Sequence, residues 1–413
     1  MGYINTTFAH GNGPFSRTLE WAIEVNNVRE ERSLSRSPIV VPLVYGDRQK
    51  IIMREEIKDN VSPDFLDEHP EEIILDEVQG NILNQLMFKG SDYAENLRHL
   101  ANDYQDLEDA LQRHLDQKRN LKYFDSKDVQ IDLRDTEFQL GLNNRVQTDI
   151  KIQFYTAGGT GPFDEILERA ILDNQIDLSI KAMQNAIPVA QRMIRNQRIV
   201  FSNDPGVFSY DRDREPRPNE IFTPPFIHPP KTDENKLSGE GVYVMMTGID
   251  GVRESGMYDA VKDLGLQIYA PRFTIDSLPS GVKEQAIELK PSAISNKDIV
   301  TQYARAGWSS VWLSHMTNTG FISPEHDSRD DPEMEFNHRG MKMFELAAFM
   351  GDDARSALEQ SIEIAKNVGE YNTRIINNYG TLDGIRYAAE IVVDYLEGKD
   401  LAKHQQIQPI LPL

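Results

Sequence analysis

The sequence contains no cysteine among its 413 residues. This absence excludes disulfide bonds, thiolate metal sites and cysteine nucleophiles, and it is typical of a cytosolic protein. The chain also lacks any run of about 18 apolar residues, which argues against a membrane-spanning helix. Because no basic stretch followed by an apolar core stands at the N-terminus, we expect no secretory leader and a cytoplasmic location.

Positive charge is scarce as well. The chain carries 44 lysines and arginines against 66 aspartates and glutamates, a formal net charge of -22. Nonspecific nucleic-acid binding requires a basic surface, so we expect no nucleic-acid partner. The same negative field repels a nucleotide at long range, so a nucleotide site in this chain needs local arginines and helix N-termini.

A repeated pentapeptide, Gly-x-Gly-Pro-Phe, is the first positive feature. It occurs at residues 11–15 and 159–163, each time after a β-like run and before a helical pattern. Glycine lets a ligand approach the backbone closely, proline suits a first helical turn, and the remaining amides can receive an anion or a sugar edge. The alternative is a tight strand-to-helix turn that binds nothing.

The length predicts two or three domains. The first unit spans residues 1–222 and alternates strands with helices, except for a helical, charge-rich insertion at about 71–120. Residues 223–240 contain prolines that neither a helix interior nor a central strand accepts. We interpret this stretch as a stiff interdomain linker.

The second unit, residues 241–380, starts again with an apolar strand and alternates in the same way. Residues 295–308 are predicted to form a helix that ends in a tight turn at Gly307, and residues 381–413 are predicted to be helical. Alternating strands and helices in both halves predict an α/β fold with two parallel-sheet domains.

The most specific stretch lies in the second unit. A glycine turn rich in hydroxyl residues (304–314) is followed by a short strand that ends in Pro324 and by an acidic segment (330–337). At these residues the chain resembles the nucleotide-sugar glycosyltransferases of the GT-B type, which have two Rossmann-like domains facing a cleft. The family usually has His-Gly-Gly at the turn, where this chain has Arg305-Ala306-Gly307. An arginine can serve a diphosphate there through its fork of donors.

The resemblance implies roles for individual residues. The donor diphosphate would be held by Arg305, Gly307, Ser309 and Ser310, and the donor sugar by Asp331, Glu333 and Asn337. Further donor contacts would come from the loop after the first strand of the second unit, at Thr247, Gly248 and Arg253. The alternative is that Trp308 and Trp312 are core residues and that Asp330 and Asp331 cap a surface helix. For the loop at residues 247–255 the alternative is an ordinary strand-to-helix turn. A C-terminal helix would cross back over the first domain.

The resemblance extends to His10, which stands after the first strand, where many enzymes of this type have a general-base histidine. A histidine can take the proton of an acceptor hydroxyl as that oxygen attacks the anomeric carbon. The alternative is a structural histidine. Because the diphosphate residues lie in the second domain, we assign the glycine loops to the acceptor side, with the residues Gly11, Asn12, Gly13, Gly159, Thr160 and Gly161.

The sequence therefore predicts a metal-independent glycosyltransferase that moves a sugar from a nucleoside diphosphate donor, such as a UDP-sugar, to an unknown acceptor, without a cofactor. Its one Asp-x-Asp triplet near the linker, residues 211–213, lies in irregular sequence. A nucleotide-sugar 2-epimerase of the same fold and a non-catalytic sugar- or nucleotide-binding protein remain as alternatives. A dinucleotide oxidoreductase is disfavoured, because the first glycine loop lacks the third glycine of that motif.

Overall fold

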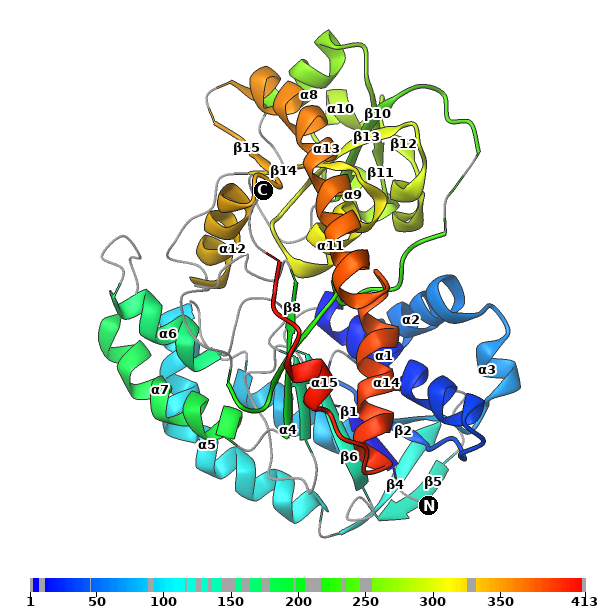
Figure 1. The fold of residues 1–413 in the computed structure, drawn as a ribbon, viewed down its shortest axis with the longest axis vertical. Coiled ribbons are helices and arrows are strands. Elements are labelled where there is room, and N and C mark those ends of the chain that lie inside the picture. Colours follow the sequence, from blue (N-terminus) through cyan, green and yellow to red (C-terminus); the bar gives the residue numbers. More distant parts are fainter. Residues whose placement is uncertain are drawn as a thin grey trace.

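The protein is described by a computed structural model, drawn in Figure 1, in which two lobes stand one above the other. The structure describes residues 3–6, 12–44, 46–87, 93–115, 117–123, 128–132, 136–142, 153–156, 163–172, 179–195, 198–204, 217–231, 233, 235–245, 255–324, 332–351 and 353–410.

The first lobe is built on a sheet of nine strands among the described residues, in the order β5-β4-β3-β2-β1-β6-β7-β8-β9. The strands are β1 (Tyr3–Thr6), β2 (Ile39–Pro42), β3 (Ile73–Asp76), β4 (Lys118–Tyr123), β5 (Asp128–Asp132), β6 (Thr136–Leu142), β7 (Gln153–Thr156), β8 (Ile199–Asn203) and β9 (Glu220–Thr223). All neighbours are parallel except β3–β4 and β4–β5, which pair antiparallel. Strands β1, β2 and β3 are almost wholly buried, as expected for a parallel sheet covered on both faces.

Helices connect these strands. They are α1 (Asn12–Glu31), α2 (Asp47–Glu56), the π-helix η1 (Ile57–Val61), α3 (Phe65–Glu68), α4 (Glu77–Met87), α5 (Tyr93–Leu115), α6 (Phe163–Leu172) and α7 (Ile180–Arg195). The helical insertion predicted at about 71–120 is therefore shorter, because its ends form β3 and β4. Its helix α5 is attached to the end of β3, since Nε2 of buried His114 lies 2.5 Å from Oδ2 of buried Asp76.

The second lobe carries a parallel sheet in the order β12-β11-β10-β13-β14-β15. Its strands are β10 (Gly241–Met245), β11 (Gln267–Ala270), β12 (Ile287–Glu288), β13 (Ile299–Ala304), β14 (Gly320–Ser323) and β15 (Ala348–Phe349). In sequence order this is 3-2-1-4-5-6, the order of a Rossmann fold. Its helices, with those that follow them to the C-terminus, are α8 (Ser255–Asp263), α9 (Arg272–Ile275), α10 (Ser280–Lys283), the 3-10 helix η4 (Pro291–Ser295), α11 (Trp308–Thr317), α12 (Pro332–Met343), α13 (Ala354–Tyr379), α14 (Gly384–Leu396) and α15 (Ala402–Gln405).

The helix predicted for residues 295–308 is wrong over most of its length. The structure has the 3-10 helix η4 up to Ser295 and then the strand β13 from Ile299 to Ala304. Strand β13 lies between two parallel neighbours and is buried on both faces, so its apolar residues do not alternate with polar ones. A strand of this kind cannot be told from a buried helix by periodicity alone.

The two lobes share a hydrophobic core, and the proline-rich linker runs through it. Phe226 of the linker is fully buried, and its ring centroid lies 5.1 Å from that of Trp21 in α1 and 6.4 Å from that of Trp312 in α11. Aromatic pairs at such separations stabilise beyond the area that they bury. The first residues of the linker are therefore interior residues. Their burial restricts the motion of the linker more strongly than proline stiffness alone.

Helix α13 runs from one lobe into the other (Figure 1). Its N-terminal part packs in the core of the second lobe through Leu358 and Ile364, and its last turns pack against Phe222 of β9 through Ile375 and Tyr379. The hydroxyl of Tyr379 donates to Oδ2 of Asp204, over 2.8 Å. The chain thus returns to the first lobe before residue 380, which is where the sequence placed the end of the second domain.

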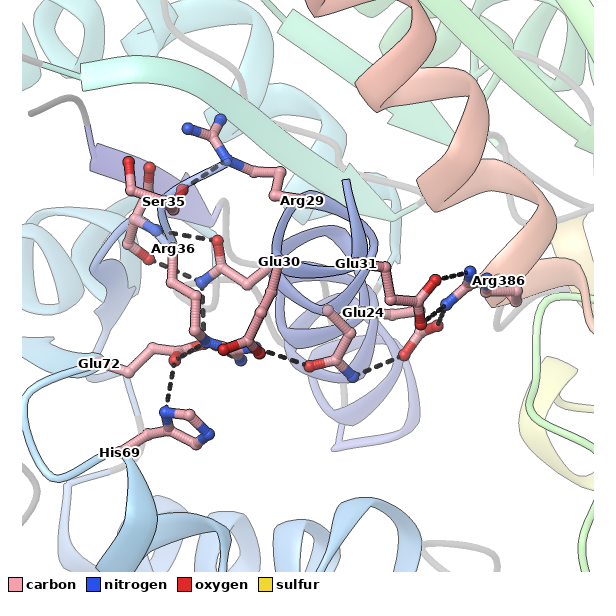
Figure 2. A network of polar contacts seen from close by, with 12 residues as sticks. Glu24, Arg29, Glu30, Glu31, Ser35, Arg36, His69, Glu72 and Arg386 are labelled. Atoms are coloured by element: carbon pink, nitrogen blue, oxygen red, sulfur yellow. Dashed lines mark hydrogen bonds and ion pairs between the residues drawn. The ribbon is translucent and has the colours of Figure 1, made fainter. Parts of the chain in front are cut away.

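Helix α14 then lies along α1, to which ion pairs bind it on both sides. Arg386 of α14 contacts Glu24, over 2.9 Å, and Glu31 of α1, as Figure 2 shows. In return Arg32, the residue that follows α1, contacts Asp394 and Glu397, each over 2.6 Å. Between these pairs the apolar side chains of α14 are fully buried, at Ile385, Ala388, Ala389, Ile391, Val392 and Val393.

The start of α14 predicts a large loss of stability on a small substitution. A Cβ at Gly384 would overlap the carbonyl oxygens of Pro224 and Pro225 in the linker, and backbone atoms cannot move aside cheaply. We expect Gly384→Ala to lower the free energy of unfolding by about 2–3 kcal/mol, measured by urea denaturation. The control is Gly281→Ala, where a Cβ would have no atom within 4 Å. Equal stability of the two variants would contradict this packing.

An ion pair beside that contact predicts a pH dependence. Nδ1 of His228 in the linker lies 2.9 Å from Oδ2 of Asp383, the N-cap residue of α14. Burial lowers the pKa of His228, but the hydrogen bond and the charge of Asp383 outweigh it, so that the pKa is raised overall. A raised pKa in the folded state stabilises the protein below the unfolded pKa of about 6.5, and this stabilisation is lost as the pH rises through the folded value.

We therefore expect His228→Gln to destabilise the protein more at about pH 5.5 than at about pH 9, with a difference on the order of 1 kcal/mol. Urea denaturation of the variant and the wild type at both pH values measures this difference. When Asp383→Asn is already present, adding His228→Gln should destabilise the protein equally at both pH values. A pH-independent effect of His228→Gln would show that the ion pair contributes nothing.

Candidate functional site

The strand order indicates where a ligand would bind in the second lobe. The order reverses between β10 and β13, and in open α/β sheets ligands bind beyond the carboxyl ends of the strands at such a point. Strand β13 ends at Ala304, so the turn Arg305-Ala306-Gly307 follows directly at this position. The first lobe has the corresponding reversal between β1 and β6, and His10 follows β1 in the sequence.

The turn leads into the N-terminus of α11. Gly307 is the N-cap residue of this helix, and we call the helix end uncapped because glycine has no side chain to cap it and no side chain of the described residues does so. The amide of Gly307 donates to the carbonyl of Arg305 over 2.7 Å, and the amides of Ser310 and Val311 donate to the carbonyl of Gly307 over 3.1 Å each. The first amides of a helix have no partner within the helix, so this end of α11 can receive a ligand.

The described residues leave room at Gly307. Among them, a Cβ at Gly307 would meet only the carbonyl oxygen of Arg305, at 4.0 Å, and the glycine has an ordinary negative φ of -87°. Neither the packing of the described residues nor the backbone conformation therefore requires glycine at this position. A ligand that approaches the backbone closely would require it.

The positive charge at the turn comes from Arg305, which is half-buried, together with the positive end of the α11 dipole. Ser310 is half-buried in the first turn of the helix. His315, in the last turn, adds no charge at neutral pH, because complete burial lowers its pKa to about 3. A guanidinium, a hydroxyl and free helix amides together can bind a phosphate group.

Helix α12 is hydrogen-bonded to the turn. Nδ2 of Asn337 donates to the carbonyl oxygen of Ala306 over 2.9 Å, and both residues are fully buried. The next residue, His338, is hydrogen-bonded through Nε2 to Oγ of Ser323, at the end of β14, over 2.9 Å. The sugar contact expected of Asn337 is not what this structure shows, because the side chain is inside the protein and faces the turn.

Several predicted residues lie outside the described part of the chain and stay predictions, namely His10, Gly11, Gly159, Thr160, Gly161, Thr247, Gly248, Arg253 and Asp331. Asn12 and Gly13 begin α1, Ser309 lies in the first turn of α11, and Glu333 lies in the first turn of α12. Trp312 is a core residue, 1% exposed, as the alternative interpretation had it.

Sequence reasoning missed two buried hydrogen bonds that join helices α11 and α12 to the strands of the sheet. Oγ of Ser314 in α11 donates to Oε1 of Gln302 in β13 over 2.6 Å, and both are buried. Gln302 gave no signal because its segment was predicted to be a helix. His338 gave none because its partner Ser323 is 15 residues away in the sequence.

Two further features concern the described residues. No group of three or more His, Cys, Asp or Glu side chains among them is placed to hold a metal ion. None of the helices in this part of the chain combines the length and the apolar character needed to cross a membrane.

Comparison with known proteins places the fold. No family model and no curated protein sequence matches the chain. Among solved structures, the chain is similar to a UDP-glucosyltransferase from Polygonum tinctorium capable of glucosylating indoxyl, with a TM-score of 0.57 and 13% identity over 97% of this chain and 99% of that one. It is also similar to the glycotransferase of kitacinnamycin, with a TM-score of 0.56 and 11% identity over 96% and 99%.

A third similar structure is the glycosyltransferase SnogD from Streptomyces nogalater, with a TM-score of 0.50 and 8% identity over 95% of this chain and 98% of that one. All three similarities extend over nearly the whole length of both chains, and at these identities they bear on the fold alone. The chain therefore has the two-domain fold of the GT-B glycosyltransferases, with two Rossmann-like domains and a helical C-terminus.

Proposed function

We propose that the protein is a glycosyltransferase that moves a sugar from a nucleoside diphosphate-sugar to a small acceptor. The observation that carries this proposal is the uncapped N-terminus of α11 at Gly307, beside Arg305, at the strand reversal of a Rossmann-like lobe. Such a helix end can bind a phosphorylated ligand, and the chain has the fold of the GT-B enzymes. Because one similar structure is a UDP-glucosyltransferase, a UDP-sugar is the first donor to test.

The proposed reaction needs two contributions from the protein. His10 takes the proton of the acceptor hydroxyl while that oxygen bonds to the anomeric carbon, and the bond from this carbon to the diphosphate oxygen breaks. The nucleoside diphosphate leaves with that electron pair. Arg305 and the first amides of α11 stabilise the charge that grows on the leaving group, so this proposal assigns no step to a metal ion.

The experiment is a donor screen that follows release of nucleoside diphosphate. The protein is incubated with UDP-, dTDP- and GDP-sugars, with and without a panel of small hydroxyl-bearing acceptors, in the presence of a chelator. Acceptor-dependent release with formation of a glycosylated product supports the proposal. Formation of a 2-epimer without acceptor identifies an epimerase instead, and binding without any turnover identifies a binding protein. No binding of any nucleoside diphosphate would overturn the donor site itself.

A further inference from the structure

Asn337 is the one buried side chain shown to bind the centre of the turn that precedes α11, within the described residues. Its amide nitrogen donates to the carbonyl oxygen of Ala306 across 31 positions in the sequence. The two flanking carbonyls are occupied locally, since that of Arg305 accepts from Gly307, and that of Gly307 accepts from Ser310 and Val311. The path of the backbone at Ala306 therefore depends on α12.

The hydrogen bond to Ala306 comes with a destabilising feature of the same side chain, which argues that the bond itself is needed. Asn337 is fully buried, and within the described part of the chain its Oδ1 has no hydrogen-bond partner. A buried acceptor without a partner destabilises a protein, and an apolar residue at position 337 would avoid that cost. The same apolar residue would remove the hydrogen bond that Asn337 donates to the buried carbonyl of Ala306. The asparagine therefore fixes the position of the turn, although its own Oδ1 stays without a partner among the described residues.

Helix α12 is itself held on both of its sides, so it can serve as a reference for the turn. His338 binds it to Ser323 at the end of the neighbouring strand β14. Phe336 packs with Leu167 and Ala170 of α6 in the first lobe, and α12 lies beside that lobe in Figure 1. A turn that is attached to α12 is therefore fixed relative to both lobes.

We propose that Asn337 is a positioning residue for the donor diphosphate, which acts through the carbonyl of Ala306 to set the direction of the first amides of α11. This inference rests on the proposed function, because it takes the bound group to be a diphosphate. It assigns Asn337 no contact with the donor. Hydrogen bonds from preorganised amides weaken steeply when their direction is lost, so the effect of removing this support is expected in ligand affinity.

The test is calorimetric titration of UDP into the full-length wild type and three variants. Asn337→Asp keeps the shape of the side chain but removes the donor, and Asn337→Ala removes the group. The matched control is Ser314→Ala, which breaks another buried hydrogen bond of α11, to Gln302, without touching the turn. We expect UDP affinity to fall about tenfold or more in both Asn337 variants and to stay within about twofold in the control. The loss of thermal stability should be similar in all three variants.

A pH series separates positioning from general damage. A buried aspartate has a raised pKa, and its protonated carboxyl can donate to Ala306 as the amide does. The affinity ratio of wild type to Asn337→Asp should therefore shrink between about pH 8 and about pH 5.5, whereas the ratio to Asn337→Ala should not.

The outcomes distinguish this inference from the proposed function. Wild type that binds UDP, with Asn337 variants no weaker than Ser314→Ala, would overturn the positioning role alone. Wild type that binds neither UDP, dTDP nor GDP would overturn the proposed function and the inference with it. If neither Asn337 variant folds while Ser314→Ala does, the side chain is a folding residue, and the positioning role is again overturned.

Discussion

Replacement of Arg305 by alanine is expected to weaken binding of a nucleoside diphosphate about 30-fold or more. The arginine stands beside the uncapped end of α11, and hydrogen bonds between charged partners contribute about 1.5–3 kcal/mol each. Its positive charge also has to overcome the field of a chain with a net charge of -22. Calorimetry with UDP measures the effect directly.

Two further variants make this experiment specific. Arg355→Ala removes the same charge from an exposed residue of the second lobe, which pairs with Glu359 over 3.0 Å, so it controls for the change in net charge. Arg305→Lys keeps the charge but removes the planar fork, and an intermediate affinity is expected. Unchanged UDP binding in Arg305→Ala would end the assignment of the turn as the diphosphate site.

Replacement of His10 by alanine is expected to reduce turnover by about 10²–10⁴-fold, the usual contribution of a general base. The affinity for the donor should change by no more than a few-fold, because the proposed diphosphate site lies in the other lobe. Initial rates with a donor and an acceptor found in the screen, together with UDP calorimetry, give both quantities.

His99→Ala is the matched control for this variant. His99 lies on α5 of the same lobe and contacts Asp103 over 3.2 Å, far along the sequence from the glycine loop. Turnover of His99→Ala should equal that of the wild type. If His10→Ala also turned over at the wild-type rate, His10 would be a structural residue, and the proton would have to go to another group.

The fold was predictable because alternating strands and helices produce recognisable patterns of apolar residues in the sequence. The strands β1, β2 and β10 and the proline-rich linker all stand out as apolar or proline-bearing runs. Strand β13 did not, since a strand buried on both faces has the same apolar content as a buried helix. The antiparallel strands β4 and β5 were missed, because Lys118–Tyr123 and Asp128–Asp132 are polar segments within a charge-rich region.

The candidate site was predictable only where it depends on neighbours in the sequence. The turn at Gly307 and the helix after it can be recognised locally, from glycine and hydroxyl residues. The support behind the turn cannot, because Asn337 reaches Ala306 only through the packing of α12 against the end of the sheet. A polar residue in a helix gives no sign in the sequence of the carbonyl that it will bind.

The return of α14 to the first lobe also bears on how the protein is made. Residues 384–396 complete the core around α1, and Arg32 meets Asp394 across 362 positions of the chain. Domains of large proteins generally fold in turn as they emerge during synthesis. Here the N-terminal lobe has its apolar face along α1 covered only after α14 has been synthesised. Its final assembly is therefore a late event, and truncation near the C-terminus would harm the lobe that is synthesised first.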